Sequence, residues 1–306
     1  MRKKIAVIGG DSRMISAAED LRADFDIALF GFDGGEFHGV VDSFCCSGGA
    51  TERPNTLDSF DMADTLDDAL KDCEAAILPI PALVGENIST PFSDKSVNSS
   101  HFMESMKANN VAKLFGGMLG KLNDASHKLG IKAYDYYDLE SFVTANAALT
   151  AEGAISVAME NLTSAIMGMR VMVLGFGRIG KLLSLKLSSL GAKVTVSARS
   201  QSDLAIISAL GMETAETKSI SEHFFDASPY GVIFNTIPHM VIGKKELESL
   251  DKNTLIIDLA SKPGGIDISA AGTLGRHVIW ALSLPGKYAP ESAGRIVAKT
   301  VRSFMI

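Results

Sequence analysis

Residues 171–180, VMVLGFGRIG, constrain the fold of this chain more than any other segment. An apolar run of the β type enters a G-x-G-x-x-G turn, which opens an amphipathic helix that stops at Gly191, and a second apolar run follows at 194–197. In such a β-α-β unit the glycines permit a tight turn, close approach of the backbone to a pyrophosphate and close helix–strand contact, while the helix N-terminus faces the negative charge. The segment predicts a bound dinucleotide, with these residues contributing: Gly175, Gly177, Arg178, Ile179 and Gly180.

The length of 306 residues suits two domains. Strand and helix signals alternate in the first half, with strands expected near 5–8, 27–30 and 75–78 and an acidic helix over 61–72, which indicates a layered parallel sheet. We therefore predict an α/β protein of two Rossmann-like layered domains, joined by a long helix, with the C-terminal helix packing back near the interdomain region. The expected parts are an N-terminal α/β domain at 1–138, a connecting helix at 139–168, a dinucleotide-binding domain at 169–290 and a C-terminal helix at 291–306.

Composition excludes several other classes of protein. The apolar fraction is 46% and the charged fraction 21%, no apolar stretch approaches the length of a membrane span, and the N-terminus shows no signal peptide. The three cysteines, including adjacent Cys45 and Cys46, suggest neither a disulfide framework nor a metal pattern. Residues 1–150 hold 13 Lys and Arg against 23 Asp and Glu, which argues against nucleic acid and anionic membranes as partners. A cytoplasmic protein without a metal is expected.

The end of the second strand of the dinucleotide unit predicts the type of cofactor. NAD-binding units carry Asp or Glu there for the ribose hydroxyls, whereas this chain has Ala198 flanked by Ser197, Arg199 and Ser200. Because Arg199 can bind a 2′-phosphate through charge-assisted hydrogen bonds, NADP is predicted in preference to NAD, and FAD is less favoured. The segment Thr236, Ile237 and Pro238, which ends a later strand, is expected to approach the ribose and nicotinamide.

Four segments together resemble a known family. They are residues 8–13 (IGGDSR), 78–81 (LPIP), 258–267 (DLASKPGGID) and 280–290 (WALSLPGKYAP). Over essentially its whole length the chain resembles the A subunit of dipicolinate synthase, and its cofactor half is similar to D-2-hydroxyacid dehydrogenases and adenosylhomocysteinase. The resemblance implies oxidation of a dihydrodipicolinate ring, or of its hydrated precursor, to pyridine-2,6-dicarboxylate in the mother cell of a sporulating bacterium. It also implies a flavoprotein-like second subunit, and we expect a homo-oligomer.

Such a substrate carries two carboxylates, so its site needs cations or helix N-termini. Arg13 follows a Gly-Gly turn at a helix start, beside Ser12, where open α/β sheets bind ligands. Lys262 follows a strand, at a position similar to that of the substrate-binding Arg in the hydroxyacid dehydrogenase pattern, and we predict a catalytic role for it. The remaining candidates are Ser89 and Thr90 as hydroxyls from the first domain, Lys287 as a substrate-binding cation, and Asn146 and His239 as catalytic residues.

The chain departs from hydroxyacid dehydrogenases at the general acid/base. Those enzymes use a late His, but here no His follows His277. Of the six histidines, which include His38, His239 is the one that we would test as the general base. Because oxidation to an aromatic ring is strongly downhill, a weak base can suffice. Two other interpretations stay open: a generic NADP-dependent hydroxyacid or amino-acid dehydrogenase, and a non-catalytic nucleotide-binding scaffold protein.

Overall fold

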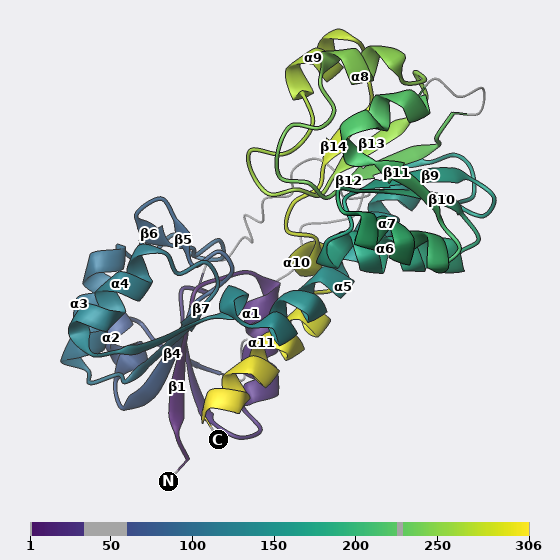
Figure 1. The fold of residues 1–306 in the computed structure, drawn as a ribbon. Helices are drawn as coiled ribbons and strands as arrows, with labels where there is room; N and C mark the ends of the chain where they lie inside the picture. Colours follow the sequence, from purple (N-terminus) through teal and green to yellow (C-terminus); the bar gives the residue numbers. More distant parts are fainter. Residues whose placement is uncertain (1, 34–59, 225–228, 306) are drawn as a thin grey trace. The chain divides into compact units, whose positions relative to one another are not determined.

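The computed structural model describes residues 2–33, 60–224 and 229–305 (Figure 1). The chain divides into two compact units, with residues 1–143 and 290–306 in unit 1 and residues 144–289 in unit 2. Both units are built on a six-stranded sheet whose paired strands are parallel. The predicted class, α/β with two Rossmann-like parallel sheets, is confirmed.

Unit 1 has the strand order β3-β2-β1-β4-β7-β8, so the chain reverses its direction across the sheet between β1 and β4. A separate antiparallel pair, β5 and β6, lies between β4 and the next helix. The strands are β1 (Lys4–Ile8), β2 (Asp26–Phe30), β3 (Asp61–Met62), β4 (Cys73–Ile77), β5 (Leu83–Val84), β6 (Asn87–Ile88), β7 (Lys113–Gly116) and β8 (Lys132–Asp135). The helices are α1 (Ser12–Leu21), α2 (Leu66–Leu70), α3 (Ser99–Ala108), α4 (Lys121–Leu129), the 3₁₀ turn η2 (Tyr136–Asp138) and α11 (Pro290–Met305).

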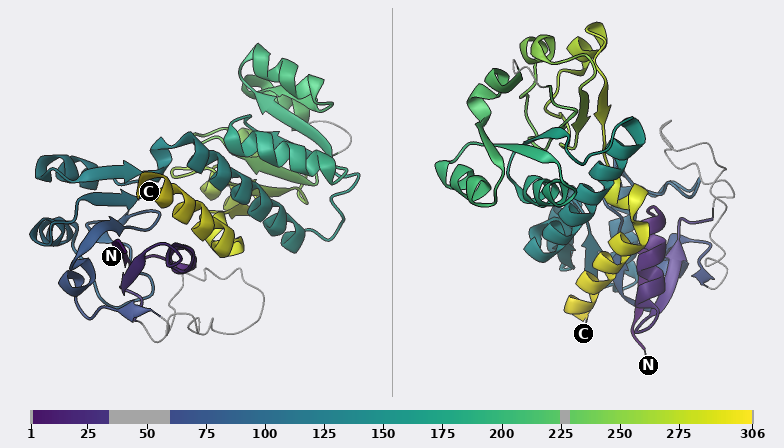
Figure 2. Two further views of the ribbon diagram at one scale, coloured as in Figure 1. Left: turned by 90° about the horizontal axis from the view of Figure 1, so that it is seen from below. Right: turned by 90° about the vertical axis from the view of Figure 1, so that its right-hand side faces the viewer.

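Alternation along β1 divides the core of unit 1 into two layers. Ile5 and Val7 face the layer that holds α1 and α11, whereas Ala6 and Ile8 face the layer of α2, α3 and α4. Both faces of the strand are therefore apolar, as expected for a parallel sheet covered by helices on both sides. Helix α11, drawn in yellow, lies beside α1, in purple, in all views (Figure 2), so the C-terminal segment is part of the core of unit 1.

Unit 2 repeats this topology, with the order β11-β10-β9-β12-β13-β14 and the reversal between β9 and β12. Its strands are β9 (Arg170–Leu174), β10 (Lys193–Ala198), β11 (Glu213–Glu216), β12 (Val232–Asn235), β13 (Leu255–Asp258) and β14 (Val278–Trp280). Its helices are α6 (Arg178–Ser189), α7 (Gln201–Ala209), the 3₁₀ segment η3 (Thr217–Phe224), α8 (Lys244–Ser249), α9 (Ile268–Thr273) and α10 (Leu284–Tyr288), and most of α5 (Glu140–Asn161) also belongs here.

Several local expectations need correction. The acidic stretch 61–72 is not one helix: Asp61–Met62 is an edge strand, and only Leu66–Leu70 is helical, because the Thr65 side chain caps that helix by accepting from the backbone N–H of Asp68. Helix α5 ends at Asn161, short of the expected 168. Strands β7 and β11 and helix α3 were not predicted, since their sequences carry few apolar residues or none in a clear period.

The expectation about membrane spans also changes. Helix α5 is long and apolar enough to cross a membrane by length and composition alone, a property that buried core helices share. The helix has this property because it is rich in alanine and has few charges. Among the described cysteines, Cys73 is a buried free thiol, and burial raises its pKa to about 11. Cys45, Cys46 and His38 lie outside the described residues.

Candidate functional site

The glycine turn of unit 2 has the geometry that its sequence predicts. Gly175 directly follows β9 and has a φ of +95°, a conformation that L side chains rarely adopt. A Cβ on Gly180 would overlap the carbonyl oxygen of Gly175 and lie 2.9 Å from its carbonyl carbon, so helix and strand meet too closely for any side chain. A Cβ on Gly177 would meet nothing within 4 Å. The backbone at Gly177 is therefore open to a ligand, whereas Gly180 is closed by the protein itself.

Two neighbouring strands hold this turn in place. The backbone N–H of Gly175 donates to two oxygens of Ser197. The nitrogen lies 3.1 Å from the Ser197 carbonyl oxygen and 3.2 Å from the Ser197 hydroxyl oxygen. From the other side, both the N–H and the hydroxyl of Thr236 donate to the carbonyl oxygen of Leu174, at 2.9 and 2.8 Å. The turn thus sits at the carboxyl ends of β10, β9 and β12, at the point where the strand order reverses and open α/β sheets bind ligands.

A cavity of about 640 Å³ opens at this place. Its size is that of a typical small-molecule or cofactor site. The predicted residues that line it are Gly175, Gly177, Arg199, Ser200, Thr236, Ile237, Pro238 and His239, and the lining also includes Phe176, Ala198, Asp203 and Thr217. Four other predicted cofactor residues are not in the lining: Arg178 and Ile179 begin α6, Gly180 packs on Gly175, and Ser197 is fully buried behind the turn. Their cofactor roles stay predictions.

The side of the cavity next to β10 carries the charged groups. Arg199 is exposed there and directly follows the strand. The hydroxyl of Ser200 caps α7: it accepts from the N–H of Asp203 at 3.1 Å and donates to the Asp203 carboxylate at 2.8 Å. The Ser200 hydroxyl therefore already has partners, and Arg199 is the arginine or lysine in the lining of the cavity, alongside the Asp203 carboxylate.

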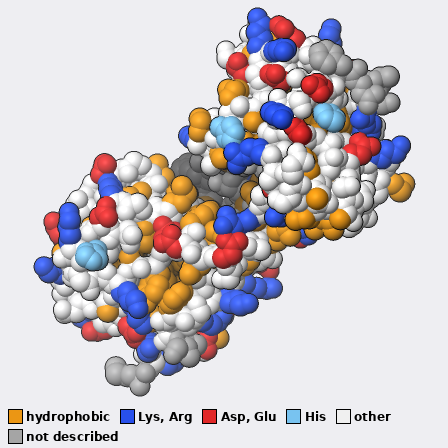
Figure 3. All heavy atoms as spheres, in the orientation of Figure 1, with side chains coloured by type: hydrophobic (Ala, Val, Ile, Leu, Met, Phe, Trp, Pro, Cys, Tyr) orange, Lys and Arg blue, Asp and Glu red, His pale blue; other side chains and the backbone are white. Residues whose placement is uncertain are grey.

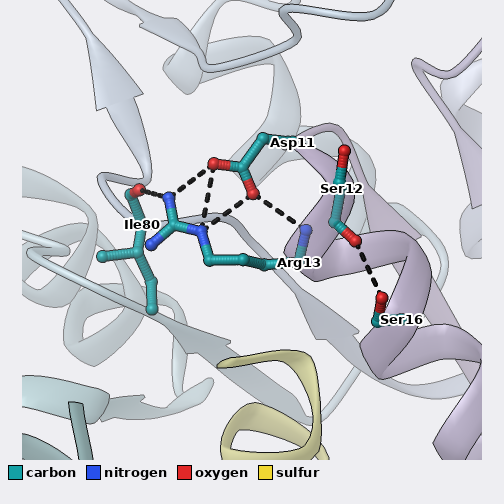
Figure 4. Close-up of polar contacts among 5 residues, drawn as sticks. All are labelled: Asp11, Ser12, Arg13, Ser16 and Ile80. Carbon is teal, nitrogen blue, oxygen red and sulfur yellow. Dashed lines mark hydrogen bonds and ion pairs between the residues drawn. The ribbon is translucent and has the colours of Figure 1, made fainter. Parts of the chain in front are cut away.

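The first turn of unit 1 contains a partly buried ion pair (Figure 4). Nε and Nη2 of Arg13 donate to the Asp11 carboxylate, at 2.8 and 2.6 Å, and Nη2 also donates to the carbonyl oxygen of Ile80 at 2.7 Å. The Arg13 side chain is 8% exposed and that of Asp11 32%. We predicted Arg13 as a clamp for a substrate carboxylate, but its charge is already balanced by Asp11. In this structure the pair ties the start of α1 to Ile80, in the segment that follows β4, and only Nη1 takes no part in these bonds (Figure 4).

Residues 89–95 cover the glycine turn of unit 1. The N–H of Gly10 donates to the carbonyl oxygen of Ser89 at 2.9 Å, and a Cβ on Gly9 would lie 2.7 Å from the methyl group of Thr90. The Thr90 hydroxyl donates to the carbonyl oxygen of Lys95 at 2.9 Å, and the ammonium of Lys95 reaches Asp33, just past β2, at 2.7 Å. In unit 2 the corresponding place, between the ends of the first two strands, is the cavity. In unit 1 the chain fills it.

The Asp33 carboxylate shows how firmly this segment is attached. Burial alone would raise its pKa, but hydrogen bonds from Lys95 and from the Ser93 hydroxyl outweigh that effect, so the pKa lies below its ordinary value. Asp33 thus stays charged and paired at neutral pH. The structure brings Ser12, Arg13, Ser89 and Thr90 together around one turn, with the Thr90 hydroxyl and the Arg13 charge bound internally.

The remaining predicted residues lie in unit 2. Lys262 is exposed in the loop between β13 and α9, and Lys287 is exposed on α10. Asn146 is half-buried on α5 and outside the cavity lining, whereas His239 is exposed at the cavity. Within the parts of the chain that the structure describes, no three His, Cys, Asp or Glu side chains gather in a way that could hold a metal.

Sequence reasoning missed several residues of this region. Asn235 and Asp258 are buried polar residues that end two apolar strands, and this position in the pattern was a usable signal. Asp11 was also detectable, since it lies two residues before Arg13 and caps the same helix. Phe176, Asp203 and Thr217 line the cavity through the tertiary fold, and Thr217 follows a strand too polar to be recognised.

These features define a class of protein: a two-unit α/β chain whose second unit is a Rossmann-type domain with a ligand cavity at its dinucleotide turn. The model of the N-terminal domain of the dipicolinate synthase A subunit matches residues 4–137. The A subunit of dipicolinate synthase from Bacillus subtilis (strain 168) is 33% identical over 99% of this chain and 95% of its own length. The chain belongs to the family of dipicolinate synthase A subunits.

Solved structures agree with this assignment. The crystal structure of the dipicolinate synthase A subunit from Bacillus halodurans has a TM-score of 0.82 at 29% identity, covering 100% of this chain and 98% of that one. Its counterpart from Bacillus subtilis gives 0.80 at 32%, covering 100% and 96%. A transhydrogenase from Sinorhizobium meliloti has the same fold, with a TM-score of 0.68 at 14% identity over 98% of this chain and 93% of that one.

Proposed function

We propose that this chain is the oxidoreductase component of a dipicolinate synthase, and that it uses NADP to oxidise a dihydrodipicolinate, or its hydrated precursor, to pyridine-2,6-dicarboxylate. One observation carries the proposal: the cavity at the turn of β9 is open at Gly177 and bordered by Arg199. The names of the relatives supply the product. The alternative, a generic hydroxyacid dehydrogenase, has no such support, because the D-lactate dehydrogenases that are similar to this chain share only its fold.

The residues present fit a dinucleotide. The open face of Gly177 suits the pyrophosphate at the start of α6, a 12-residue helix whose first N–H groups have no intrahelical partners. Thr236, Ile237 and Pro238 border the same cavity and are proposed to hold the ribose and nicotinamide end. When bound, an oxidised nicotinamide supplies a hydride acceptor.

Arg199 is the proposed determinant of the preference for NADP. We expect Arg199→Asp to weaken NADP binding about 10- to 100-fold, because a charge-assisted hydrogen bond is worth about 1.5–3 kcal/mol, and to change NAD binding far less. Lys193→Asp is the matched control, since Lys193 is exposed at the opposite end of the same strand. Calorimetric titration of both variants with NADP and NAD measures the effect. Unchanged NADP affinity in Arg199→Asp would contradict the assignment of NADP.

The substrate roles are proposed separately for each unit. In unit 2, Lys262 and Lys287 are exposed cations suited to ring carboxylates, Asn146 a hydrogen-bonding amide, and His239 an acceptor for the proton that the ring loses. In unit 1, the N-terminus of α1 at Ser12 and the hydroxyl of Ser89 are proposed to bind a carboxylate. There the Asp11–Arg13 pair fixes the turn, and Thr90 supports it through Lys95.

The relatives are named as one subunit of an enzyme, which implies a partner. We propose a flavoprotein-like second subunit, a homo-oligomer of this chain and a location in the cytoplasm of the mother cell. Apolar side chains gather on the side of unit 2 where α6 and α7 lie (Figure 3), and Leu185, Leu190, Ile206 and Leu210 are each 41–47% exposed there. Exposed apolar patches of this kind are typical of protein interfaces.

Turnover by the purified chain tests the function. We expect pyridine-dicarboxylate absorbance to rise when NADP⁺ and freshly generated dihydrodipicolinate precursor are added with the second subunit, and NADPH to form in equal amount. Product without NADPH would assign the oxidation to a flavin of the partner. The same assay is run without the second subunit. Dinucleotide binding without any product, with or without the second subunit, would instead support a non-catalytic nucleotide-binding scaffold.

A further inference from the structure

Two buried polar residues join the ends of two strands in unit 2. Asn235 ends β12 and Asp258 ends β13, and they are paired in register. Asn235 is 0% exposed and Asp258 1%. The Asn235 amide donates to the Asp258 carboxylate with 2.8 Å between Nδ2 and Oδ1. Because an unpaired carboxylate at such burial is strongly unfavourable, the partners of Asp258 determine how the surrounding backbone is arranged.

The Asn235 side chain fixes residues 236–238, which border the cavity and are called the cavity loop below. Its Oδ1 accepts from the N–H of Ile237 at 3.1 Å, and its Nδ2 donates to the carbonyl oxygen of Ile237 at 3.0 Å. Ile237 is thus held by both of its backbone polar groups. The neighbours of Ile237 in the chain, Thr236 and Pro238, line the cavity with it.

The Asp258 carboxylate fixes the other loop, residues 259–266, which carries Lys262 and is called the Lys262 loop below. It accepts from the N–H of Ala260 at 3.0 Å through Oδ1 and from the N–H of Gly265 at 2.8 Å through Oδ2. Both ends of the loop are therefore bound to one side chain. Gly265 also lies against the cavity loop, since a Cβ there would overlap Nδ2 of Asn235 and lie 2.6 Å from the Ile237 carbonyl oxygen.

Lys262 itself depends on this support. Its side chain is exposed, and within the described part of the chain it makes no hydrogen bond or ion pair. Its position is consequently set by the backbone on either side of it. The indole N–H of Trp280 adds one more bond to the loop, to the carbonyl oxygen of Ala260 at 2.9 Å.

We infer that Asn235 and Asp258 form a positioning bridge that holds Lys262 in a fixed place relative to the cavity loop, without touching cofactor or substrate. The inference rests on the proposed function, in which the cavity holds a dinucleotide and Lys262 binds the substrate. Positioning matters because a displacement of about 1 Å by a distant residue can cost about 100-fold in rate.

The test uses Asp258→Asn, with Asp267→Asn as the matched control. Asp267 is in the same region but caps α9 by accepting from the N–H of Ala270 at 2.9 Å, a task that Asn performs as well. The single tryptophan, Trp280, reports on the Lys262 loop directly. In Asp258→Asn we expect greater acrylamide quenching of Trp280, about tenfold weaker dinucleotide binding and about 100-fold slower turnover. We expect Asp267→Asn to match the wild type in all three.

A double-mutant cycle separates positioning from a general loss of structure. If Asp258 acts through Lys262, adding Asp258→Asn to Lys262→Ala will cause little further loss of kcat; independent, multiplied losses would overturn the inference. If Asp258→Asn does not fold, Asn235→Ala tests the bridge from its other end. Quenching equal to that of Asp267→Asn in both bridge variants would also overturn it. Failure of the wild-type chain to bind any dinucleotide would refute the proposed function instead, and the quenching comparison would still decide whether the bridge exists.

Discussion

Gly180→Ala is expected to destabilise unit 2 by about 3 kcal/mol, a large part of the stability of a typical domain. The added methyl group would overlap the carbonyl oxygen of Gly175. Gly175 cannot retreat, because its N–H is held by Ser197 and its own φ of +95° leaves little freedom. Urea denaturation followed by the fluorescence of Trp280, which lies in unit 2, measures the loss.

Gly177→Ala is the matched control and should behave in the opposite way. Its methyl group meets nothing within 4 Å, so we expect a stability change of no more than about 1 kcal/mol, the difference between Gly and Ala at a helix N-cap. The methyl group would instead project where the backbone is open to a pyrophosphate, and dinucleotide affinity should fall by at least about tenfold. Equal stability of the two variants, or unchanged affinity in Gly177→Ala, would contradict this account of the turn.

Gly294→Ala is expected to destabilise unit 1 by about 2–3 kcal/mol. Replacing Gly by Ala within a helix normally stabilises it by about 0.5–1 kcal/mol, so the expected sign is reversed. The reason is the contact between α11 and α1, where a Cβ on Gly294 would lie 2.6 Å from the carbonyl oxygen of Arg13 and 2.7 Å from the backbone nitrogen of Ala17. Hydrogen exchange of the amides of β1 and α1 measures the loss in unit 1 separately.

Gly272→Ala serves as the control for Gly294→Ala. Gly272 is also within a helix, α9, but a Cβ there would meet nothing within 4 Å. We expect this substitution to be neutral or slightly stabilising. A stable Gly294→Ala variant would show that α11 can move away from α1 at little cost, contrary to the burial of Val297, Ala298 and Val301 in the same core.

Local patterns in the sequence predicted the parts of this structure that depend on neighbouring residues. The β9–turn–α6–β10 unit was predicted because its apolar periods and glycine spacings are contiguous. Strands β7 and β11 were not predicted, because Lys113–Gly116 and Glu213–Glu216 owe their extended form to pairing with distant strands. Two Rossmann-like parallel sheets were predicted, but the order of the strands within each sheet was not, since strand order leaves no periodic signal in the residues.

In the candidate site, too, residues near a sequence motif were predicted, whereas contacts between residues far apart in the chain were not. Arg199 was located at the cavity from its distance along the chain after the glycine turn. The pairing of Arg13 with Asp11 was within reach, but its bond to the carbonyl oxygen of Ile80 joins residues 67 apart. The same is true of residues 89–95, whose contacts with Gly9 and Asp33 required the fold to be known.

The segment that covers the glycine turn of unit 1 has a consequence for stoichiometry. Two sheets of one strand order would suggest two nucleotides per chain. Ser89 and Thr90 take up the place next to Gly9 and Gly10, and Lys95 neutralises Asp33, the carboxylate that follows β2 where a nucleotide-binding unit would offer one to a ribose. Among the described residues, the place for a second dinucleotide is thus filled by the chain itself, and we expect one dinucleotide per chain, at the cavity of unit 2.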